Sequence, residues 1–136
     1  MRDPDYSYVG YKKSCTINTA LAVDIWISGF NSVYNDPNGL YDLILKGPVA
    51  VAMFVNSSFQ NYKSGIFNCN SDNSDSVNHA VTLVGQTYVS LFTSYWIVKN
   101  SWGTGWGNQG YIWIQLRPNP SDCNISKYGY QAKFSN

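Results

Sequence analysis

The sequence predicts an α+β fold that is mainly antiparallel β-sheet, with two short helices. Hydrophobic residues make up 44% of the 136 residues and charged residues 12%, a balance typical of a packed globular core. Runs rich in β-branched and aromatic residues recur along the chain and are separated by Gly-rich or polar breaks. Two other stretches carry helical spacing or capping residues instead. At this length we expect one domain, or part of a larger one.

An irregular segment and then a strand are expected at the start of the chain. Residues 1–20 are punctuated by Pro4 and Gly10, which favours irregular structure. Residues 21–30, LAVDIWISGF, carry β-branched and aromatic side chains, and Gly29 lies at their end, as is typical of a strand. The sheet is therefore expected to begin near residue 21.

Two short helices are expected next. Residues 35–48, NDPNGLYDLILKGP, have leucine and isoleucine at helical spacing, with Asn38 as the expected N-cap and a Gly-Pro pair as the stop. Residues 57–65, SSFQNYKSG, predict one or two helical turns with Ser57 or Ser58 as N-cap and a glycine at the end. The helices are therefore small additions to the sheet.

Four further runs predict strands. Residues 49–55, VAVAMFV, are expected to form a buried strand between the two helices. Residues 79–86 (HAVTLVGQ), 94–101 (SYWIVKNS) and 110–116 (GYIWIQL) are β-branched and aromatic, with polar or Gly-rich breaks between them.

Composition argues against several classes of function. The formal net charge is +1, which gives nucleic-acid binding no electrostatic support. The longest apolar runs, such as PVAVAMFV, are too short to cross a bilayer, so no membrane partner is expected. One histidine and three scattered cysteines do not form a zinc-ligand spacing, so we expect no metal and no cofactor.

The cellular compartment is only weakly indicated. The start of the chain, MRDPDYSYVGYKK, lacks the apolar region of a secretory signal, so the chain is either cytosolic or preceded by further residues. Two Asn-x-Ser triplets whose middle residue is not proline, at Asn56 and Asn124, give weak support for a secretory route, because such triplets are also common by chance.

The single histidine, His79, begins one expected strand, and Asn100 ends another. Antiparallel neighbours could bring these ends together, and the amide oxygen would then accept the proton on one imidazole nitrogen. That contact fixes the tautomer and frees the other nitrogen for proton transfer, which suits a histidine paired with a thiolate. On residue types alone, a structural histidine beside an apolar strand is the simpler interpretation.

A glycine-rich segment follows Asn100. Trp102 lies two residues later, where its indole would exclude water from an Asn–His hydrogen bond and so strengthen it. Glycines at positions 103, 105 and 107 allow tight turns around Trp102 and Trp106, which we expect to support the site.

Four motifs carry a resemblance to a known family. The segments VNHAV, YWIVKNSWGTGWGNQGYI, GPVAVA and SFQNYKSGIFNC resemble the C-terminal half of papain-like cysteine peptidases of the cathepsin type, from about residue 6 to about residue 130. The resemblance implies the β-barrel-like C-terminal domain of that fold and a lysosomal or secreted location. It also implies that His79 is general base and acid for a cysteine nucleophile, that Asn100 orients it, and that Trp102 shields the pair.

The resemblance implies roles for the three cysteines as well. GIFNC and PSDC match the two ends of a family disulfide, which predicts a Cys69–Cys123 bond rather than two buried thiols. Closing a loop of this length would stabilise the folded state by about 4 kcal/mol in the chain-entropy model. Cys15 matches a cysteine whose partner lies in the family's N-terminal domain. Two neighbouring lysines would lower the pKa of the Cys15 thiol, but nothing in the sequence places it near His79.

Three residues are implied to lie near a peptide or protein substrate. Ala52, Val77 and Asn78 match positions near the pocket for the side chain that precedes the scissile residue. Small apolar walls would suit a bulky apolar side chain there, although Ala52 and Val77 fit equally well as ordinary core residues.

The family's nucleophile has no counterpart in the sequence. In the family a cysteine in a Cys-Gly-(Ser/Ala)-Cys-(Trp/Tyr) motif precedes the histidine by roughly 130–150 residues, whereas only 78 residues precede His79. The oxyanion-hole glutamine is also missing. We therefore interpret residues 1–136 as a partial peptidase domain, inactive alone, whose N-terminal domain is an absent partner. The alternative is a non-catalytic papain-like homologue that acts as a binding or structural protein.

Overall fold

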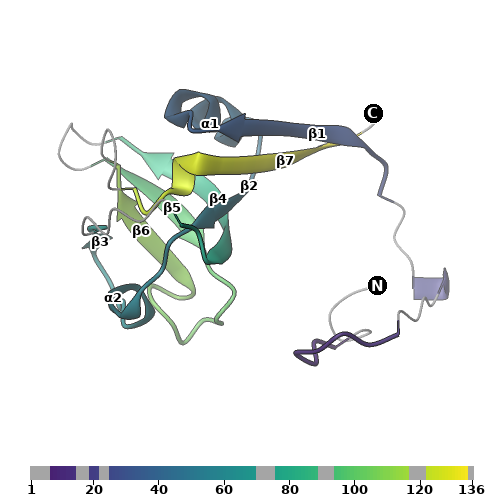
Figure 1. Cartoon of the computed structure of the whole chain (residues 1–136), viewed down its shortest axis with the longest axis horizontal. Helices are drawn as coiled ribbons and strands as arrows, with labels where there is room; N and C mark the ends of the chain where they lie inside the picture. Colours follow the sequence, from purple (N-terminus) through teal and green to yellow (C-terminus); the bar gives the residue numbers. More distant parts are fainter. Residues whose placement is uncertain are drawn as a thin grey trace.

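The computed structural model of the protein describes residues 7–14, 19–21, 25–69, 76–88, 94–116 and 122–134. Seven strands and a few short helical segments lie in these ranges (Figure 1). The strands are β1 (Ile27–Tyr34), β2 (Val49–Met53), β3 (Ile66–Phe67), β4 (His79–Thr87), β5 (Tyr95–Lys99), β6 (Tyr111–Gln115) and β7 (Tyr128–Phe134). The helical segments are α1 (Pro37–Ile44), α2 (Ser57–Gln60) and the 3₁₀ turns η2 (Thr19–Leu21) and η3 (Ile125–Lys127).

The described strands form one sheet in the order β1-β7-β2-β4-β5-β6-β3. Neighbouring strands are antiparallel, except that β3 and β6 are parallel. The prediction of a mainly antiparallel α+β fold is therefore confirmed. Within the described residues the sheet is open, with β1 and β3 at its edges, so it is not closed into a barrel.

The core lies on the inner face of β2, β4, β5 and β6. Buried side chains alternate with less buried ones along β2, β5, β6 and the first half of β4, as expected where one face of a strand packs on a core. The strands expected at 49–55, 79–86, 94–101 and 110–116 are confirmed, with ends that differ by one or two residues. The buried residues on these strands are Val49, Val51, Met53, Val81, Leu83, Trp96, Val98, Ile112 and Ile114.

The first expected strand is displaced along the sequence. It was expected at residues 21–30, whereas β1 begins at Ile27 and continues to Tyr34, and residues 22–24 lie outside the described ranges. Gly29 does not end the strand, because it forms part of a bulge at which the register with β7 shifts. Its φ of +155° is one that glycine adopts readily.

The N-cap of helix α1 lies two residues before the expected one. Asp36 is the N-cap instead of Asn38, and its carboxylate accepts a hydrogen bond of 2.9 Å from the Gly39 N–H. Pro37 occupies the first turn, where its missing N–H costs nothing. The choice of Asn38 was therefore wrong, because the Asp-Pro pair already supplies the cap and the start.

Helix α2 is a single turn of four residues, and its N-cap is Asn56 rather than Ser57 or Ser58. The Asn56 side-chain oxygen accepts a hydrogen bond of 3.1 Å from the Phe59 N–H. Phe59 is the buried residue of this turn. No helix in the described ranges has the length and apolarity needed to cross a bilayer.

Strand β7 was not predicted, although it joins β1 to the rest of the sheet. Its core-facing residues are Gly129 and Gln131, which do not form an apolar pattern. A Cβ atom at Gly129 would lie 2.7 Å from the side chain of Val33 and 3.0 Å from that of Leu40, so glycine allows β1 and α1 to approach the strand closely. The Gln131 amide donates to the carbonyl oxygens of Leu43 and Gly47 at 2.9 and 2.8 Å, which ties β7 to the end of α1.

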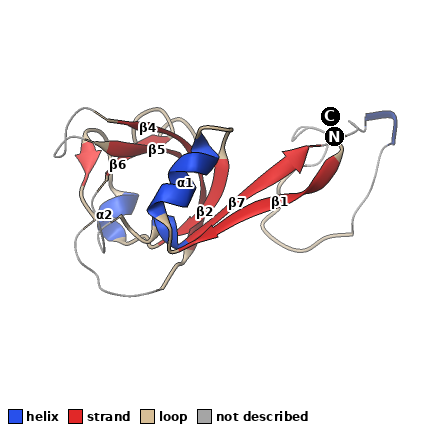
Figure 2. Ribbon diagram, turned by 90° about the horizontal axis from the view of Figure 1, so that it is seen from above, coloured by secondary structure: helices blue, strands red, loops and turns tan. Residues whose placement is uncertain are grey.

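Strands β1 and β7 form a two-stranded ribbon that extends beyond the rest of the sheet, as Figure 2 shows. One face of this ribbon is apolar and exposed. The Phe30 and Tyr130 rings lie 6.1 Å apart on it, and the two side chains are 65% and 50% exposed. We call this surface the ribbon face, made of Ile27, Phe30, Tyr34, Tyr130 and Phe134.

Candidate active site

The sheet brings His79 and Asn100 together. His79 is the first residue of β4, and Asn100 directly follows β5, the antiparallel neighbour of β4. The backbone N–H of Asn100 donates to the carbonyl oxygen of Gly110 at 2.9 Å, which holds the end of β5 in place. His79 Nε2 and Asn100 Oδ1 lie 2.9 Å apart and form a hydrogen bond. The expected meeting of these two strand ends is therefore present.

A second hydrogen bond fixes the direction of the first. The backbone N–H of Ser101 donates to Asn100 Oδ1 at 2.8 Å, and of the two polar atoms of a side-chain amide only the oxygen can accept a hydrogen bond. The amide therefore presents its oxygen to the imidazole, so His79 Nε2 carries the hydrogen of this bond. In the neutral ring the lone pair then lies on Nδ1, the nitrogen on the other side.

Asn100 is buried, whereas His79 is half-buried. Asn100 Nδ2 is buried as well, and it has no hydrogen-bond partner among the described residues. The side chain is therefore held through its oxygen, which serves both the Ser101 N–H and the imidazole.

An aromatic cluster surrounds the His79 ring. The Trp102 ring lies 5.0 Å from that of His79, at 38° between the planes, and remains 39% exposed. Phe59, only 1% exposed, contacts Trp102 at 5.7 Å and Trp106 at 5.2 Å, both between ring centroids. Trp102 therefore covers one side of the histidine ring, and Phe59 supports Trp102 from the core.

Phe59 was not identified from the sequence as part of the site. It lies 6.3 Å from the His79 ring, measured between centroids. The sequence places it in a short helix twenty residues from the histidine, and no local pattern links the two. Only the packing of α2 against the glycine-rich segment brings them together.

Trp106 anchors the glycine-rich segment to α2. Its indole nitrogen donates a hydrogen bond of 2.9 Å to the Gln60 carbonyl oxygen. A glycine is required at position 107, next to Trp106, because its φ is +57° and a Cβ atom there would lie 2.6 Å from the Tyr111 carbonyl oxygen.

Tyr62 packs against Trp106 and donates from its hydroxyl to the Gly65 carbonyl oxygen at 2.6 Å. Burial raises the pKa of Tyr62.

The Asn78 side chain forms hydrogen bonds with both the backbone N–H and the backbone carbonyl oxygen of Val55. Its Oδ1 accepts from the Val55 N–H at 2.8 Å, and its Nδ2 donates to the Val55 carbonyl oxygen at 2.9 Å. The Asn78 N–H donates in turn to the Met53 carbonyl oxygen at 3.0 Å. These bonds extend the β2–β4 pairing one step beyond the Met53–His79 pair and fix the entry of the chain into His79.

The other two residues expected near substrate lie in β2 and directly before β4. Ala52 is half-buried in β2, opposite Ala80, and Val77 is half-buried just before β4. Their contact with a substrate stays a prediction.

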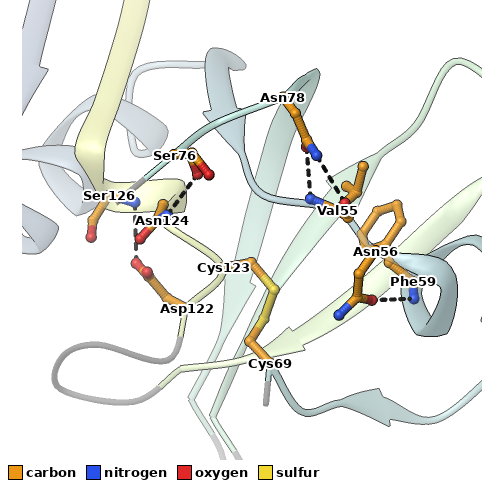
Figure 3. The surroundings of a disulfide bond; sticks show 10 residues. All are labelled: Val55, Asn56, Phe59, Cys69, Ser76, Asn78, Asp122, Cys123, Asn124 and Ser126. Carbon is orange, nitrogen blue, oxygen red and sulfur yellow. Dashed lines mark hydrogen bonds between the residues drawn. A yellow bond between two sulfur atoms is a disulfide. The ribbon is translucent and has the colours of Figure 1, made fainter. Parts of the chain in front are cut away.

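A disulfide joins Cys69 and Cys123, with Cα atoms 5.4 Å apart (Figure 3). It connects the segment after β3 to the segment before η3. The Cys123 carbonyl oxygen accepts from the Phe54 N–H at 2.8 Å, so the bridge lies next to the segment that Asn78 binds. Cys15 lies outside the described residues. In the described part of the chain, no group of three or more histidine, cysteine or acidic residues is placed to hold a metal ion.

Comparison with known proteins shows the family to which the chain belongs. The family model described as papain family cysteine protease matches residues 1–132. Fruit bromelain of Ananas comosus is 34% identical over 113 residues, and vignain of Vigna mungo is 38% identical over 129 residues. Pro-cathepsin H of Mus musculus is 38% identical over 122 residues. The chain belongs to the papain family of cysteine proteases.

Solved structures show the same fold. The bromelain protease of Ananas comosus superposes with a TM-score of 0.81 at 34% identity, and a Carica candamarcensis cysteine protease with 0.80 at 30%. These matches cover 98% and 96% of this chain, but 62% and 60% of the solved chains. The three curated relatives named above are matched over 81%, 92% and 88% of this chain. The same matches cover 31%, 33% and 36% of those relatives, so the chain spans about a third of their length.

Proposed function

We propose that this chain is the histidine- and asparagine-bearing part of a cysteine endopeptidase that hydrolyses peptide bonds by a Cys-His-Asn mechanism. The observation that carries the proposal is the hydrogen bond of 2.9 Å between His79 Nε2 and Asn100 Oδ1 in a member of the papain family. This bond leaves Nδ1 as the basic nitrogen. A cysteine thiol placed at Nδ1 would complete the catalytic group.

In this mechanism His79 acts first as base and then as acid. Nδ1 takes the proton of the cysteine thiol, and the thiolate attacks the peptide carbonyl carbon. His79 then gives the proton to the leaving amine nitrogen as the C–N bond breaks, which leaves an acyl thioester. His79 finally takes a proton from water, whose oxygen attacks the thioester, and returns it to the departing sulfur. Asn100 keeps the ring oriented throughout.

An amide suits the orienting role beside a thiolate. The imidazolium formed in the first step is already stabilised by the negative sulfur, so it needs orientation more than a second negative charge. Trp102 contributes by covering one side of the ring and excluding water from the Asn–His bond.

The substrate of this activity is a peptide or protein. Ala52, Val77 and Asn78 are proposed to lie near the pocket for the side chain that precedes the scissile residue. The fixed amide of Asn78 supports this part of the site, because its two bonds to Val55 hold the pocket's backbone beside His79.

The cysteine is proposed to come from an N-terminal peptidase domain that packs against this chain, so that residues 1–136 form a partial domain and are inactive alone. Two observations support this. The chain spans about a third of its curated relatives, by the shares of 31%, 33% and 36% given above. The ribbon face presents an apolar surface that a second domain would bury.

A lysosomal or secreted location is part of the same proposal. A disulfide such as Cys69–Cys123 forms and persists in oxidising compartments, whereas thiols are kept reduced in the cytosol.

A chimera tests the proposed activity. The chain alone is expected to show no turnover of peptide substrates and no labelling by an epoxide thiol inhibitor. Joined to the N-terminal domain of a papain-family cysteine protease, it should gain turnover that His79→Ala abolishes and Asn100→Ala lowers at least about tenfold. Lys99→Ala, at an exposed neighbour of Asn100, is the matched control and should leave turnover unchanged. Turnover by the chain alone, or a chimera that unfolds cooperatively but is inert, would overturn the proposal.

A non-catalytic homologue is the second candidate. The observation in its favour is that Cys69 and Cys123, the cysteines in the described residues, are both in the disulfide, so neither offers a thiol to His79. Sequencing the transcript upstream of the Met1 codon distinguishes the two. A cysteine in the family's nucleophile motif supports the peptidase, and a serine or glycine in its place supports a binding or structural role.

A further inference from the structure

The segment that leads into His79 makes a polar contact with the residue that directly precedes η3. Asn124 Nδ2 donates a hydrogen bond of 3.0 Å to the carbonyl oxygen of Ser76, three residues before the histidine. Figure 3 shows this bond next to the Cys69–Cys123 disulfide. A residue near the end of the chain therefore holds the backbone close to the candidate catalytic base.

The contacts around this segment form a closed ring. The Cys123 carbonyl oxygen accepts from the Phe54 N–H at 2.8 Å, and the residue after Phe54 is the one that the Asn78 side chain binds. Asn78 follows Ser76 by two residues. The bond from Asn124 to Ser76 closes the ring, because Asn124 directly follows the cysteine. Loss of any one of these bonds opens the ring and loosens the segment between Ser76 and Asn78.

The backbone at the Asn124 end of the ring is fixed. Cys123 and Asn124 both have left-handed backbones, with φ of +55° and +64°. Residues other than glycine adopt this conformation mainly where surrounding contacts impose it, although asparagine tolerates it better than most. The bond to Cys69 is one such contact, since it ties the bend to the segment after β3. The Asn124 amide is therefore presented to Ser76 from an anchored bend.

We infer that Asn124 is a positioning residue for His79 and acts through the backbone of Ser76. His79 is the first residue of β4, and the ends of elements open more readily than their middles. The bond to Ser76 keeps the chain in place ahead of the strand, so that the end of β4 stays paired. Without it the end of the strand frays, and the imidazole leaves the position in which its Nε2 lies 2.9 Å from Asn100 Oδ1. The inference rests on the proposed peptidase function, in which this histidine transfers protons.

Nitrogen NMR of the whole chain tests the inference, because His79 is the single histidine and gives one pair of ring nitrogen signals. In the wild type the neutral ring should show two well-separated signals, as expected for a hydrogen fixed on Nε2. Asn124→Gly removes the donor to Ser76 and suits the left-handed backbone, and it should move the two signals towards each other as the tautomers mix. Asn124→Asp keeps the size of the side chain but cannot donate when ionised, and it should have the same effect.

Asn35→Gly is the matched control. Asn35 also has a left-handed backbone, with a φ of +47°, but it lies in the turn between β1 and α1. This variant should keep the wild-type separation of the His79 signals. A cooperative urea transition in each variant shows that the signals come from folded chains.

The chimera with an N-terminal domain gives a second readout. There Asn124→Gly should lower kcat by at least about threefold and change KM less, because a small displacement of a reacting group slows the chemical step. Three results would overturn the inference: wild-type separation of the His79 signals in both Asn124 variants, an equal shift in Asn35→Gly, or an unchanged kcat in an active chimera. The spectra need no nucleophile, so the expected shift can be absent while the chimera is active, and present while the chimera is inert.

Discussion

The indole nitrogen of Trp106 donates a hydrogen bond of 2.9 Å to the carbonyl oxygen of Gln60, and so joins the glycine-rich segment after β5 to the end of α2. Trp106→Phe keeps an aromatic ring but removes this donor. We expect the free energy of unfolding to fall by about 1–2 kcal/mol, from the lost bond and the smaller ring. Urea unfolding measures the change.

Trp113→Phe is the matched control for this prediction. Trp113 is half-buried and stacks on Tyr95 at 5.3 Å on the other side of the sheet. A loss of stability at Trp113 equal to that at Trp106 would contradict a special role for the Trp106–Gln60 bond.

The two hydrogen bonds between the Asn78 side chain and the Val55 backbone lead to a second prediction. Asn78→Ala removes both side-chain hydrogen bonds and should lower the free energy of unfolding by about 1–2 kcal/mol. Asn78→Asp should recover only part of this loss, because a carboxylate can accept from the Val55 N–H but cannot donate to the Val55 carbonyl oxygen. Urea unfolding gives the stabilities, and nitrogen NMR of the His79 ring reports whether the Nε2–H tautomer is still fixed.

Asn61→Ala serves as the control for Asn78. Asn61 makes one local hydrogen bond, from Nδ2 to the Ser57 carbonyl oxygen at 2.9 Å. It should change stability by less than about 0.5 kcal/mol and leave the His79 tautomer unchanged. Should Asn78→Ala leave the His79 signals as they are in the wild type, Asn78 does not position the histidine.

The Cys69–Cys123 disulfide closes a loop with a sequence separation of 54 residues. Replacing both cysteines by serine should lower the stability by about 4 kcal/mol in the chain-entropy model. Thermal unfolding with and without reductant measures this. Reductant should lower the melting temperature of the wild type towards that of the double variant, and it should not affect the double variant. A Cys15→Ser variant that lost the sensitivity to reductant would point to a different disulfide.

The ribbon face predicts how the isolated chain behaves in solution. Its exposed aromatic side chains should bind a hydrophobic dye or cause self-association. Replacing Phe30 and Tyr130 by threonine should lower the dye fluorescence severalfold, whereas Tyr41→Thr, at an exposed tyrosine of α1, should not. Fluorescence and light scattering give the readouts, and a monomeric chain that leaves the dye dark would refute the expectation.

Burial of Tyr62 predicts a loss of stability in alkali. Burial raises its pKa above the usual 10.0, so the folded state holds the phenolic proton more tightly than the unfolded state. The resulting stabilisation is present below the unfolded pKa and is lost as the pH rises through the folded pKa. Unfolding free energies between about pH 8 and pH 11 should therefore fall less steeply in Tyr62→Phe than in the wild type. Tyr88→Phe, at a tyrosine that is 71% exposed, should keep the wild-type slope.

The strands of the core were predictable because each carries its own signal. The run that contains Val49 to Met53 is short, apolar throughout and preceded by a Gly-Pro pair, which is typical of a buried strand. Strand β7 lacks such a signal. Its buried positions are Gly129 and Gln131, and these are explained only by the approach of Val33 and by the carbonyl groups at the end of α1.

The candidate site also has a part that could be predicted from the sequence and a part that could not. The His79–Asn100 pair follows from the sequence, because each residue stands at the end of a recognisable strand. The support from Phe59 and the binding of Val55 by Asn78 do not, because no sequence pattern links α2 or the segment after β2 to the residues around His79. The helix caps at Asp36 and Asn56 were missed by one or two residues, because several neighbouring residues in each stretch could serve as a cap.

The pairing of β1 with β7 also sets the order in which the protein can be completed on the ribosome. Strand β1 is made early, but its hydrogen-bonding partner is formed by residues 128–134. Until that segment has left the exit tunnel, β1 lacks β7, its one neighbour in the described sheet, and the backbone edge that β7 will cover stays accessible. The sheet can therefore be completed only after translation of its last strand, and during that interval the nascent chain is a natural client for chaperones that bind extended apolar segments.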